Sequence, residues 1–239
     1  MKRYIDAHCH MGTNTDLNDV MHTNTARGIV GYVCNGVTFH DWMDIIAIGT
    51  RPEIYPCIGI HPWNIKETPE NWAAQMHGIL FNNPNLMIGE IGLDNHYPEM
   101  DTQIEFCKIQ MEYAAEFKRV AHVHCVGAWD KMLWLLKLCR NLPPAIIAHG
   151  FAGPADIIDR AADKYNMYFS YSPAILNPAR ARIRQCVSKT PRNRILIESD
   201  GDISNAHQII NVANEISQIR GTDMANIIYN NTMGIIQHG

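Results

Sequence analysis

Asp6-Ala7-His8-Cys9-His10 ends the first β-rich run of the chain and places two imidazoles two residues apart. On a β-strand, residues at this spacing point to the same face. If that face lines a barrel or a cleft, His8 and His10 form a chelating pair for a divalent metal ion, because neutral imidazole is a common ligand of such ions. The alternative is a pair of histidines in a surface turn. Ligand-type residues at the ends of later strands would decide between these two interpretations.

The rest of the chain alternates short β-rich runs with longer helical patterns. The β-rich runs lie at residues 3–8, 28–35, 54–60, 86–93, 120–125, 145–149, 167–171 and 194–199. Helical patterns between them include residues 102–117, 129–139 and 209–219, and Gln103 is expected outside the apolar side of the first. About eight βα units predict a single-domain TIM (β/α)8 barrel. A doubly wound open sheet is the alternative, but no Gly-x-Gly-x-x-Gly follows an early strand.

The length and composition of the chain favour one domain over residues 1–239. Hydrophobic residues make up 46% of the chain and charged residues 18%, and no linker-like stretch divides the sequence. No run of about 18 apolar residues could span a bilayer, and the N-terminus lacks the apolar segment of a signal peptide. Seven cysteines without a C-x-x-C pair argue against a disulfide framework. We therefore expect a soluble, cytoplasmic protein with no membrane association and no obligate protein partner.

The formal net charge of −4 argues against a protein that coats nucleic acid through a broad basic surface. A nuclease is still compatible with this charge, because its positive potential can be local and partly metallic.

Side chains able to bind a metal recur where the predicted strands end, which is where an α/β barrel carries its functional groups. Six of them would converge on one mouth of the barrel: His8, His10, Glu90, His124, His149 and Asp200. The mixture of imidazole and carboxylate suits zinc, manganese or iron better than calcium, with magnesium as a further alternative. Six ligands are too many for one tetrahedral ion. The sequence therefore predicts two divalent ions that share a carboxylate, an arrangement suited to phosphoryl displacement.

Two further polar residues precede predicted metal ligands by two positions and so lie further from the carboxyl ends of their strands. His122 precedes His124 by two residues, and Glu198 precedes Asp200 by two. We assign the later residue of each pair to the metal because it is closer to the carboxyl end of its strand. His122 is then a structural residue, and Glu198 belongs to a buried network that orients the ligands.

The ordered motifs resemble those of the TatD-like metal-dependent hydrolases, also described as TatD-related DNases, within the amidohydrolase-like barrels. The segments that carry the resemblance are Asp6-Ala7-His8-Cys9-His10, Gly59-Ile60-His61-Pro62-Trp63, Gly89-Glu90-Ile91-Gly92-Leu93-Asp94, Val123-His124-Cys125, Ala148-His149-Gly150-Phe151-Ala152-Gly153 and Ile195-Leu196-Ile197-Glu198-Ser199-Asp200. They occur in order and cover most of the chain.

The resemblance implies a binuclear centre in which His8 and His10 hold one metal ion and His124 and His149 the other. It further implies that Glu90 bridges the two ions and that Asp200 completes the first. The expected reaction is attack of a metal-activated water on a phosphodiester, with DNA as the candidate substrate and with Asp200, Glu90 and His61 as catalytic residues. Asp200 would orient the water or accept its proton, and His61 would donate to the phosphate. The alternative for His61 is a histidine that caps the turn before Pro62.

The chain departs from the family pattern near the expected phosphate site. Met11-Gly12 stands where many members have an acidic residue, and Val126 where an arginine commonly follows the histidine of the fifth strand. A basic stretch after the seventh strand could border the mouth in place of that arginine, although a solvated helix face is the simpler interpretation. Its residues are Arg180, Arg182, Arg184, Lys189, Arg192 and Arg194. Four aromatic residues near strand ends could stack bases or line any pocket: Trp63, Tyr97, Phe151 and Tyr171.

Three other functions stay open at this point. One is an amidohydrolase of the lactonase or phosphotriesterase type, which builds a similar centre around a carboxylated lysine, but no lysine lies in the motif around Glu90. Another is a phosphoesterase that acts on small molecules. The third is a degenerate barrel that binds a partner without catalysis, which predicts missing ligands.

Overall fold

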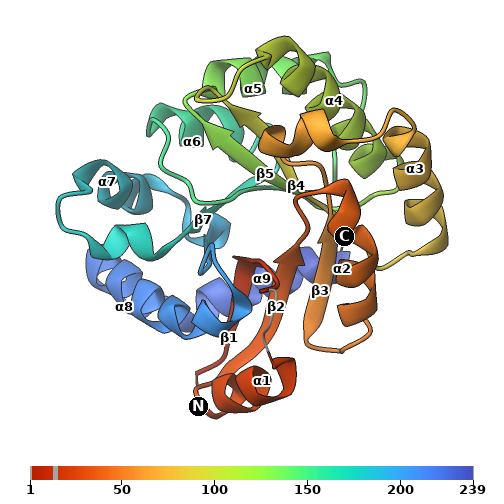
Figure 1. Cartoon of the computed structure of the whole chain (residues 1–239). Coiled ribbons are helices and arrows are strands. Elements are labelled where there is room, and N and C mark those ends of the chain that lie inside the picture. Colours follow the sequence, from red (N-terminus) through yellow and green to blue (C-terminus); the bar gives the residue numbers. More distant parts are fainter. Residues whose placement is uncertain (1, 13–15, 239) are drawn as a thin grey trace.

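Eight parallel strands form the centre of the molecule in a computed structural model that describes residues 2–12 and 16–238 (Figure 1). The strands are β1 (Tyr4–Cys9), β2 (Ile29–Asn35), β3 (Ile54–Ile58), β4 (Met87–Asp94), β5 (Ala121–Val126), β6 (Ile146–Ala148), β7 (Met167–Tyr171) and β8 (Ile195–Ile197). Each strand pairs in parallel with the next one in the sequence. This sequential order excludes the doubly wound sheet, whose strand order reverses at a switch point.

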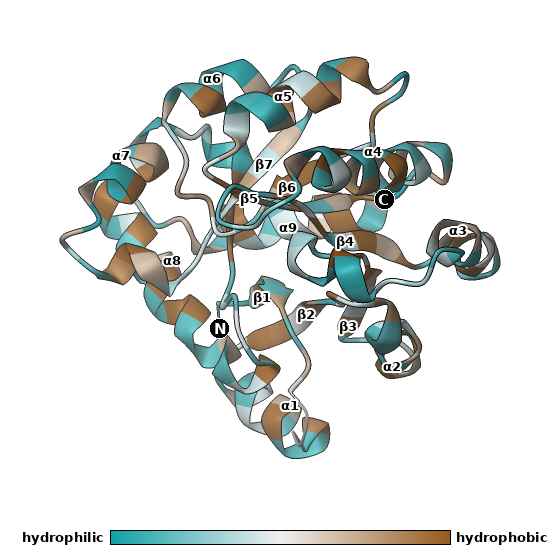
Figure 2. Ribbon diagram, turned by 45° about the horizontal axis from the view of Figure 1, so that its top comes forward, coloured by the Kyte–Doolittle hydropathy of each residue, from teal (hydrophilic) through white to brown (hydrophobic). Residues whose placement is uncertain are grey.

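Helices cover the outside of the strands and present apolar faces to them (Figures 1 and 2). They are α1 (Leu17–Ala26), α2 (Trp42–Ile48), α3 (Trp72–Asn82), α4 (Met100–Glu116), α5 (Trp129–Leu138), α6 (Asp156–Ala161), α7 (Ala181–Lys189) and α8 (Ile209–Arg220). The last helix, α9 (Ala225–His238), instead reaches the amino ends of the strands, where Ile235 packs with residues inside the barrel. Short 3-10 segments join several of the helices, including η2 (Pro62–Glu67) after β3. The first helix begins where the Asp16 carboxylate accepts hydrogen bonds from the amides of Asn18 and Asp19, which satisfies two otherwise unpaired donors.

Alternate residues of each strand enter two different hydrophobic cores. Between the strands and the helices lies the larger core, which includes Ile58, Ile88 and Phe169. Inside the barrel lies a smaller one, to which Val33, Met87, Leu196 and other strand residues contribute together with Ile235 of α9. Because both faces of the strands are buried, their sequences are almost continuously apolar, and a polar residue within them is an exception that needs a partner.

The chain closes on itself where the segments after β1 and β8 meet. The amide of His10 donates to the carbonyl of Gly201 at 2.8 Å, and the amide of Asp200 donates to the carbonyl of His8 at 3.1 Å. The buried carboxylate of Asp6 accepts the amide of Ser199 at 2.9 Å across the same seam. These contacts place the first and last metal-ligand candidates, which are almost 200 residues apart in the sequence, side by side.

The barrel predicted from the alternation of β-rich and helical patterns is confirmed, and each of the eight predicted runs overlaps one strand. The prediction for Gln103 is wrong, because this side chain of α4 is buried. Its oxygen accepts the amide of Asp94 at 2.8 Å, and its amide group donates to the carbonyl of the same residue at 3.1 Å. Gln110, two turns further on, braces Ile60 in the same way. Both glutamines satisfy backbone groups at strand ends that lead to the functional site.

Within the described part of the chain, no helix is long and apolar enough to span a membrane.

Candidate metal centre

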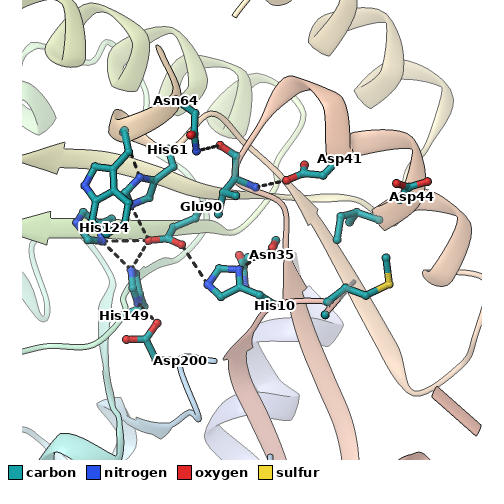
Figure 3. Close-up of a pocket in the computed structure, with 15 residues that line it drawn as sticks. His10, Asn35, Asp41, Asp44, His61, Asn64, Glu90, His124, His149 and Asp200 are labelled. Carbon is teal, nitrogen blue, oxygen red and sulfur yellow. Dashed lines mark hydrogen bonds and ion pairs between the residues drawn. The ribbon is translucent and has the colours of Figure 1, made fainter. Parts of the chain in front are cut away.

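The six predicted ligands come together at the carboxyl ends of the strands, and Figure 3 shows five of them, all except His8. His8 lies in β1, Glu90 in β4 and His124 in β5. His10 and His149 directly follow β1 and β6, and Asp200 lies three residues after the end of β8. Five of the six line one cavity of about 730 Å³, and His8 lies fully buried beneath it. His61, which follows β3, lines the same cavity. His8 and His10 therefore lie together with possible ligands from five other strands or the segments that follow them.

Glu90 lies at the centre of the cluster, and its two oxygens contact different pairs of histidines. One oxygen, Oε2, lies 3.3 Å from His8 Nε2 and 3.5 Å from His10 Nε2. The other, Oε1, lies 3.0 Å from His124 Nδ1 and 2.7 Å from His149 Nε2. A carboxylate with one oxygen toward each of two imidazole pairs has the form required of a ligand shared by two ions.

Asp200 lies between the two sides of the cluster. Its carboxylate forms one compact group of possible ligand atoms with His8 and His10, and another with His149 and Glu198. The distance from Asp200 Oδ1 to His149 Nδ1 is 3.8 Å, and the side chain is 40% exposed. Of the carboxylates of Glu90, Glu198 and Asp200, only that of Asp200 both contacts the cluster and is exposed to solvent.

The unpaired nitrogens of the cluster fit divalent ions. Nδ1 of the buried His8 has no hydrogen-bond partner among the described residues, and Nε2 has only the Glu90 carboxylate, at 3.3 Å, although buried polar atoms are normally paired. His10 Nδ1 lies 3.0 Å from the carbonyl oxygen of Asn35, so this nitrogen carries the proton and Nε2 is left with a free lone pair. Imidazole and carboxylate donors in this arrangement suit zinc or manganese.

Burial and the neighbouring charges shift the pKa values of the site in opposite directions. Burial favours a raised pKa for Glu90, but the surrounding imidazoles, His149 foremost, outweigh it and hold the pKa of Glu90 well below its usual range. Burial likewise favours a lowered pKa for His149, but Glu90 and Glu198 raise the pKa of this ring well above its usual value. Burial lowers the pKa of His61 and of His8, so both rings are neutral and able to coordinate or donate at neutral pH.

Comparison with known proteins decides the family. A family model described as TatD related DNase matches residues 5–237. This chain belongs to the TatD related DNase family. The uncharacterized metal-dependent hydrolase YabD of Bacillus subtilis is 26% identical over 223 residues, which are 90% of this chain and 86% of YabD. The 3'-5' ssDNA/RNA exonuclease TatD of Salmonella typhimurium is 26% identical over 191 residues, which are 77% of this chain and 72% of that enzyme.

Solved structures show the same fold. The crystal structure of YjjV, a TatD homologue from Escherichia coli, has a TM-score of 0.88 to this chain at 21% identity and covers 98% of this chain and 97% of its own. Amidohydrolase 2 from Bifidobacterium longum has a TM-score of 0.63 at 10% identity, which shows a shared barrel only. The sequence-based prediction of a metal-dependent hydrolase of the TatD family is confirmed.

Further buried polar residues lie next to the histidines of the candidate metal centre. Asp94 Oδ2 lies 3.3 Å from His124 Nε2 and accepts the indole N–H of Trp63 at 2.8 Å. Glu198 is fully buried, accepts the amide of Gly150 at 2.5 Å and lies 3.6 Å from His149 Nδ1. His122 is also fully buried, and neither of its ring nitrogens has a partner among the described residues. Burial lowers the pKa of His122 to about 3, which keeps the ring neutral.

Sequence reasoning missed Asn35, whose carbonyl oxygen orients His10. A signal was present, because Asn35 is the last residue of the second β-rich run and therefore occupies a strand end like the predicted ligands. The contact itself uses a backbone atom, which any residue type supplies. The residue type therefore could not reveal it.

The basic stretch after β7, from Arg180 to Arg194, does not line the cavity that holds the candidate metal ligands. Three of its members pair with carboxylates outside the site: Arg184 with Glu215, Lys189 with Asp159 and Arg194 with Asp163. Neither arginine nor lysine occurs among the described residues that line the cavity. Met11 and Gly12, one of the departures from the family pattern, do line it, as do Asp41 and Asp44, which lie on the side away from His124 and His149 (Figure 3).

Gly92 allows the strands that carry Glu90 and His124 to approach each other. Its φ is +152°, and a Cβ at this position would lie 1.8 Å from the carbonyl oxygen of His124. We expect Gly92→Ala to reduce the free energy of unfolding by at least about 2 kcal/mol, because the backbone must move to relieve the clash. Urea denaturation measures this change.

Gly78 of α3 provides the matched control, because a Cβ there meets no atom within 4 Å. Gly78→Ala is expected to stabilise the protein by about 0.5 to 1 kcal/mol, since alanine favours the helix. Equal effects of the two substitutions would contradict the steric role of Gly92.

Proposed function

We propose that this protein is a phosphodiesterase that cleaves nucleic acid, DNA foremost, at a centre of two divalent metal ions. The observation that carries the proposal is the position of Glu90, with Oε2 toward His8 and His10 and Oε1 toward His124 and His149. In this proposal the first pair and Asp200 hold one ion, the second pair holds the other, and Glu90 bridges them. Zinc, manganese and magnesium are the candidate ions. Nucleic acid is chosen as the substrate because relatives in the TatD family are described as nucleases.

When bound, the ions would lower the pKa of a water molecule and stabilise the charge that develops on the phosphate oxygens. Two divalent ions against the carboxylates of Glu90 and Asp200 leave the centre net positive. A phosphodiester monoanion is attracted to such a centre even though no basic side chain lines the described part of the cavity.

Asp200 is the proposed acceptor of the proton that the attacking water loses. Its side chain is 40% exposed and directed into the cavity, whereas Glu90 and Glu198 are buried and engaged with histidines or backbone amides. A carboxylate that touches both the cluster and solvent can take the proton and release it to bulk water.

His61 is the proposed donor to a phosphate oxygen. The amide of Trp63 donates to His61 Nδ1 at 3.2 Å, so the proton of the neutral ring lies on Nε2. Nε2 lies 3.2 Å from Glu90 Oε1, at the edge of the cluster. A donor in this place stabilises negative charge on the substrate as it develops.

The test is a substrate profile of the protein reconstituted with Mn²⁺, Zn²⁺ or Mg²⁺. We expect cleavage of single-stranded DNA and RNA and no cleavage of lactones or amides. The double variant His124→Ala/Asp200→Ala should lose roughly 1000-fold or more of the activity, because it removes a ligand from each ion.

His22→Ala on the exposed face of α1 is the matched histidine control and should retain full activity. Lactone or amide cleavage without phosphodiester cleavage, or activity that survives the double substitution, would overturn the proposal.

A further inference from the structure

Two aromatic side chains stack at the edge of the cavity and are open to solvent. Trp63 of η2 is 51% exposed and Tyr97, which follows β4, is 40% exposed. Their ring centroids lie 5.0 Å apart with an interplanar angle of 20°. The other aromatic residues considered as stacking partners, Phe151 and Tyr171, are buried in the core and cannot receive a ligand. The sequence-based set of four is thereby reduced to one pair.

The indole of Trp63 is fixed rather than free to turn. Its N–H donates to Asp94 Oδ2 at 2.8 Å, and Tyr97 packs against it. The rings of His61 and Trp63 meet edge to face, with centroids 4.6 Å apart and an interplanar angle of 81°. Because the only hydrogen-bond donor of the indole is occupied within the protein, the side chain offers a ligand its ring surface.

The location of Trp63 joins this surface to the metal cluster. Trp63 lines the cavity of about 730 Å³ together with Glu90 and His124. It also lines a neighbouring hollow of about 220 Å³ together with Tyr97 and Pro98. A chain that binds across the cluster would therefore pass the indole on its way out of the cavity.

We propose that Trp63, supported by Tyr97, is the stacking platform for a nucleobase beside the scissile phosphate. The proposal rests on the proposed nuclease function and adds that this site binds a base of the nucleic acid. A flat heteroaromatic ring matches the exposed ring surface, and such stacking tolerates any base sequence. It also supplies affinity where the described cavity wall has no arginine or lysine to hold the backbone phosphates.

The kinetic test compares Trp63→Ala with wild type on two single-stranded oligonucleotides, one complete and one without bases on both sides of the cleaved bond. For the complete strand we expect the KM to rise about 10-fold in the variant, since base stacking on an aromatic side chain contributes an amount of this order. For the abasic strand the KM should be the same in both proteins. Equal changes on the two strands, or no change on either, would overturn the platform.

Two further variants separate stacking from support of the metal ligands. Trp63→Phe keeps an aromatic surface but loses the hydrogen bond to Asp94, so its KM for the complete strand should stay within about threefold of wild type. Trp134→Ala on α5 is the matched control, because Trp134 is 52% exposed and lines none of the described cavities. If Trp63→Phe raises the KM for both strands as much as Trp63→Ala does, the role of Trp63 is structural.

Direct binding decides the matter independently of catalysis. In the Asp200→Asn variant, a single-stranded oligonucleotide should quench tryptophan fluorescence, and the additional substitution Trp63→Phe should remove this quench while Trp134→Phe leaves it. A quench that persists without Trp63, or no binding at all, would overturn the proposal. If wild type binds the strand through Trp63 but hydrolyses no phosphodiester, the proposed function fails and the platform stands.

Discussion

Glu90→Gln is expected to lower kcat for phosphodiester cleavage by roughly 1000-fold or more and to reduce the metal content from two ions per chain to one or none. The substitution keeps the size of the side chain but removes its charge. Only one carbonyl oxygen remains, so the group can no longer offer an acceptor to both histidine pairs, which now face Oε1 and Oε2. The amide NH₂ would instead point at imidazole lone pairs needed for the metal.

Elemental analysis of protein purified without chelators measures the metal content, and steady-state kinetics measures kcat. Glu116→Gln is the matched control, because Glu116 lies 3.1 Å from His77 Nε2 in an exposed glutamate–histidine pair away from the cavity. This control should keep both ions and full activity. Two bound ions and normal turnover in Glu90→Gln would refute the bridging role of Glu90.

Removal of the metal ions is expected to abolish hydrolysis, and addition of a divalent cation should restore it. The melting temperature should fall as well, because ions that bind only the folded chain stabilise it by roughly 3 kcal/mol per site at about 100 times their Kd. Treatment with a chelator followed by dialysis, with activity and thermal denaturation measured before and after adding back Mn²⁺ or Zn²⁺, tests both effects. Activity that survives complete removal of the ions would exclude a metal-dependent reaction.

The apparent metal affinity should rise with pH. Glu90 and Glu198 raise the pKa of His149 against the effect of burial. Protonation of His149 therefore stabilises the metal-free fold fully below about pH 6.5, and this contribution is lost as the pH rises through the raised pKa. A metal ion must displace that proton, so binding releases protons and strengthens as the pH rises. Titration calorimetry in buffers of different ionisation enthalpy measures the number of protons released.

The periodicity of the sequence was sufficient to predict the barrel. Alternating β-rich and helical patterns identified every strand, because strands buried on both faces have continuous apolar sequences that stand out from amphipathic helices. Polar residues at the ends of such strands are unusual, and this is why His8, Glu90, His124 and His149 could be recognised together. Gln103 was placed wrongly, because helical periodicity assigns a glutamine to the solvent side and does not show that a strand end needs its amide.

The sequence by itself determined the type of barrel, the family and the set of metal-ligand candidates, since these depend on residue type and spacing along the chain. Only the tertiary structure decided how the two oxygens of Glu90 divide the histidines, and that the carbonyl of Asn35 orients His10. It also decided that Trp63 and Tyr97, and not Phe151 or Tyr171, are open to a ligand. The physical reason is that hydrogen bonds, ring stacking and burial depend on where strands distant in sequence bring their ends together in space.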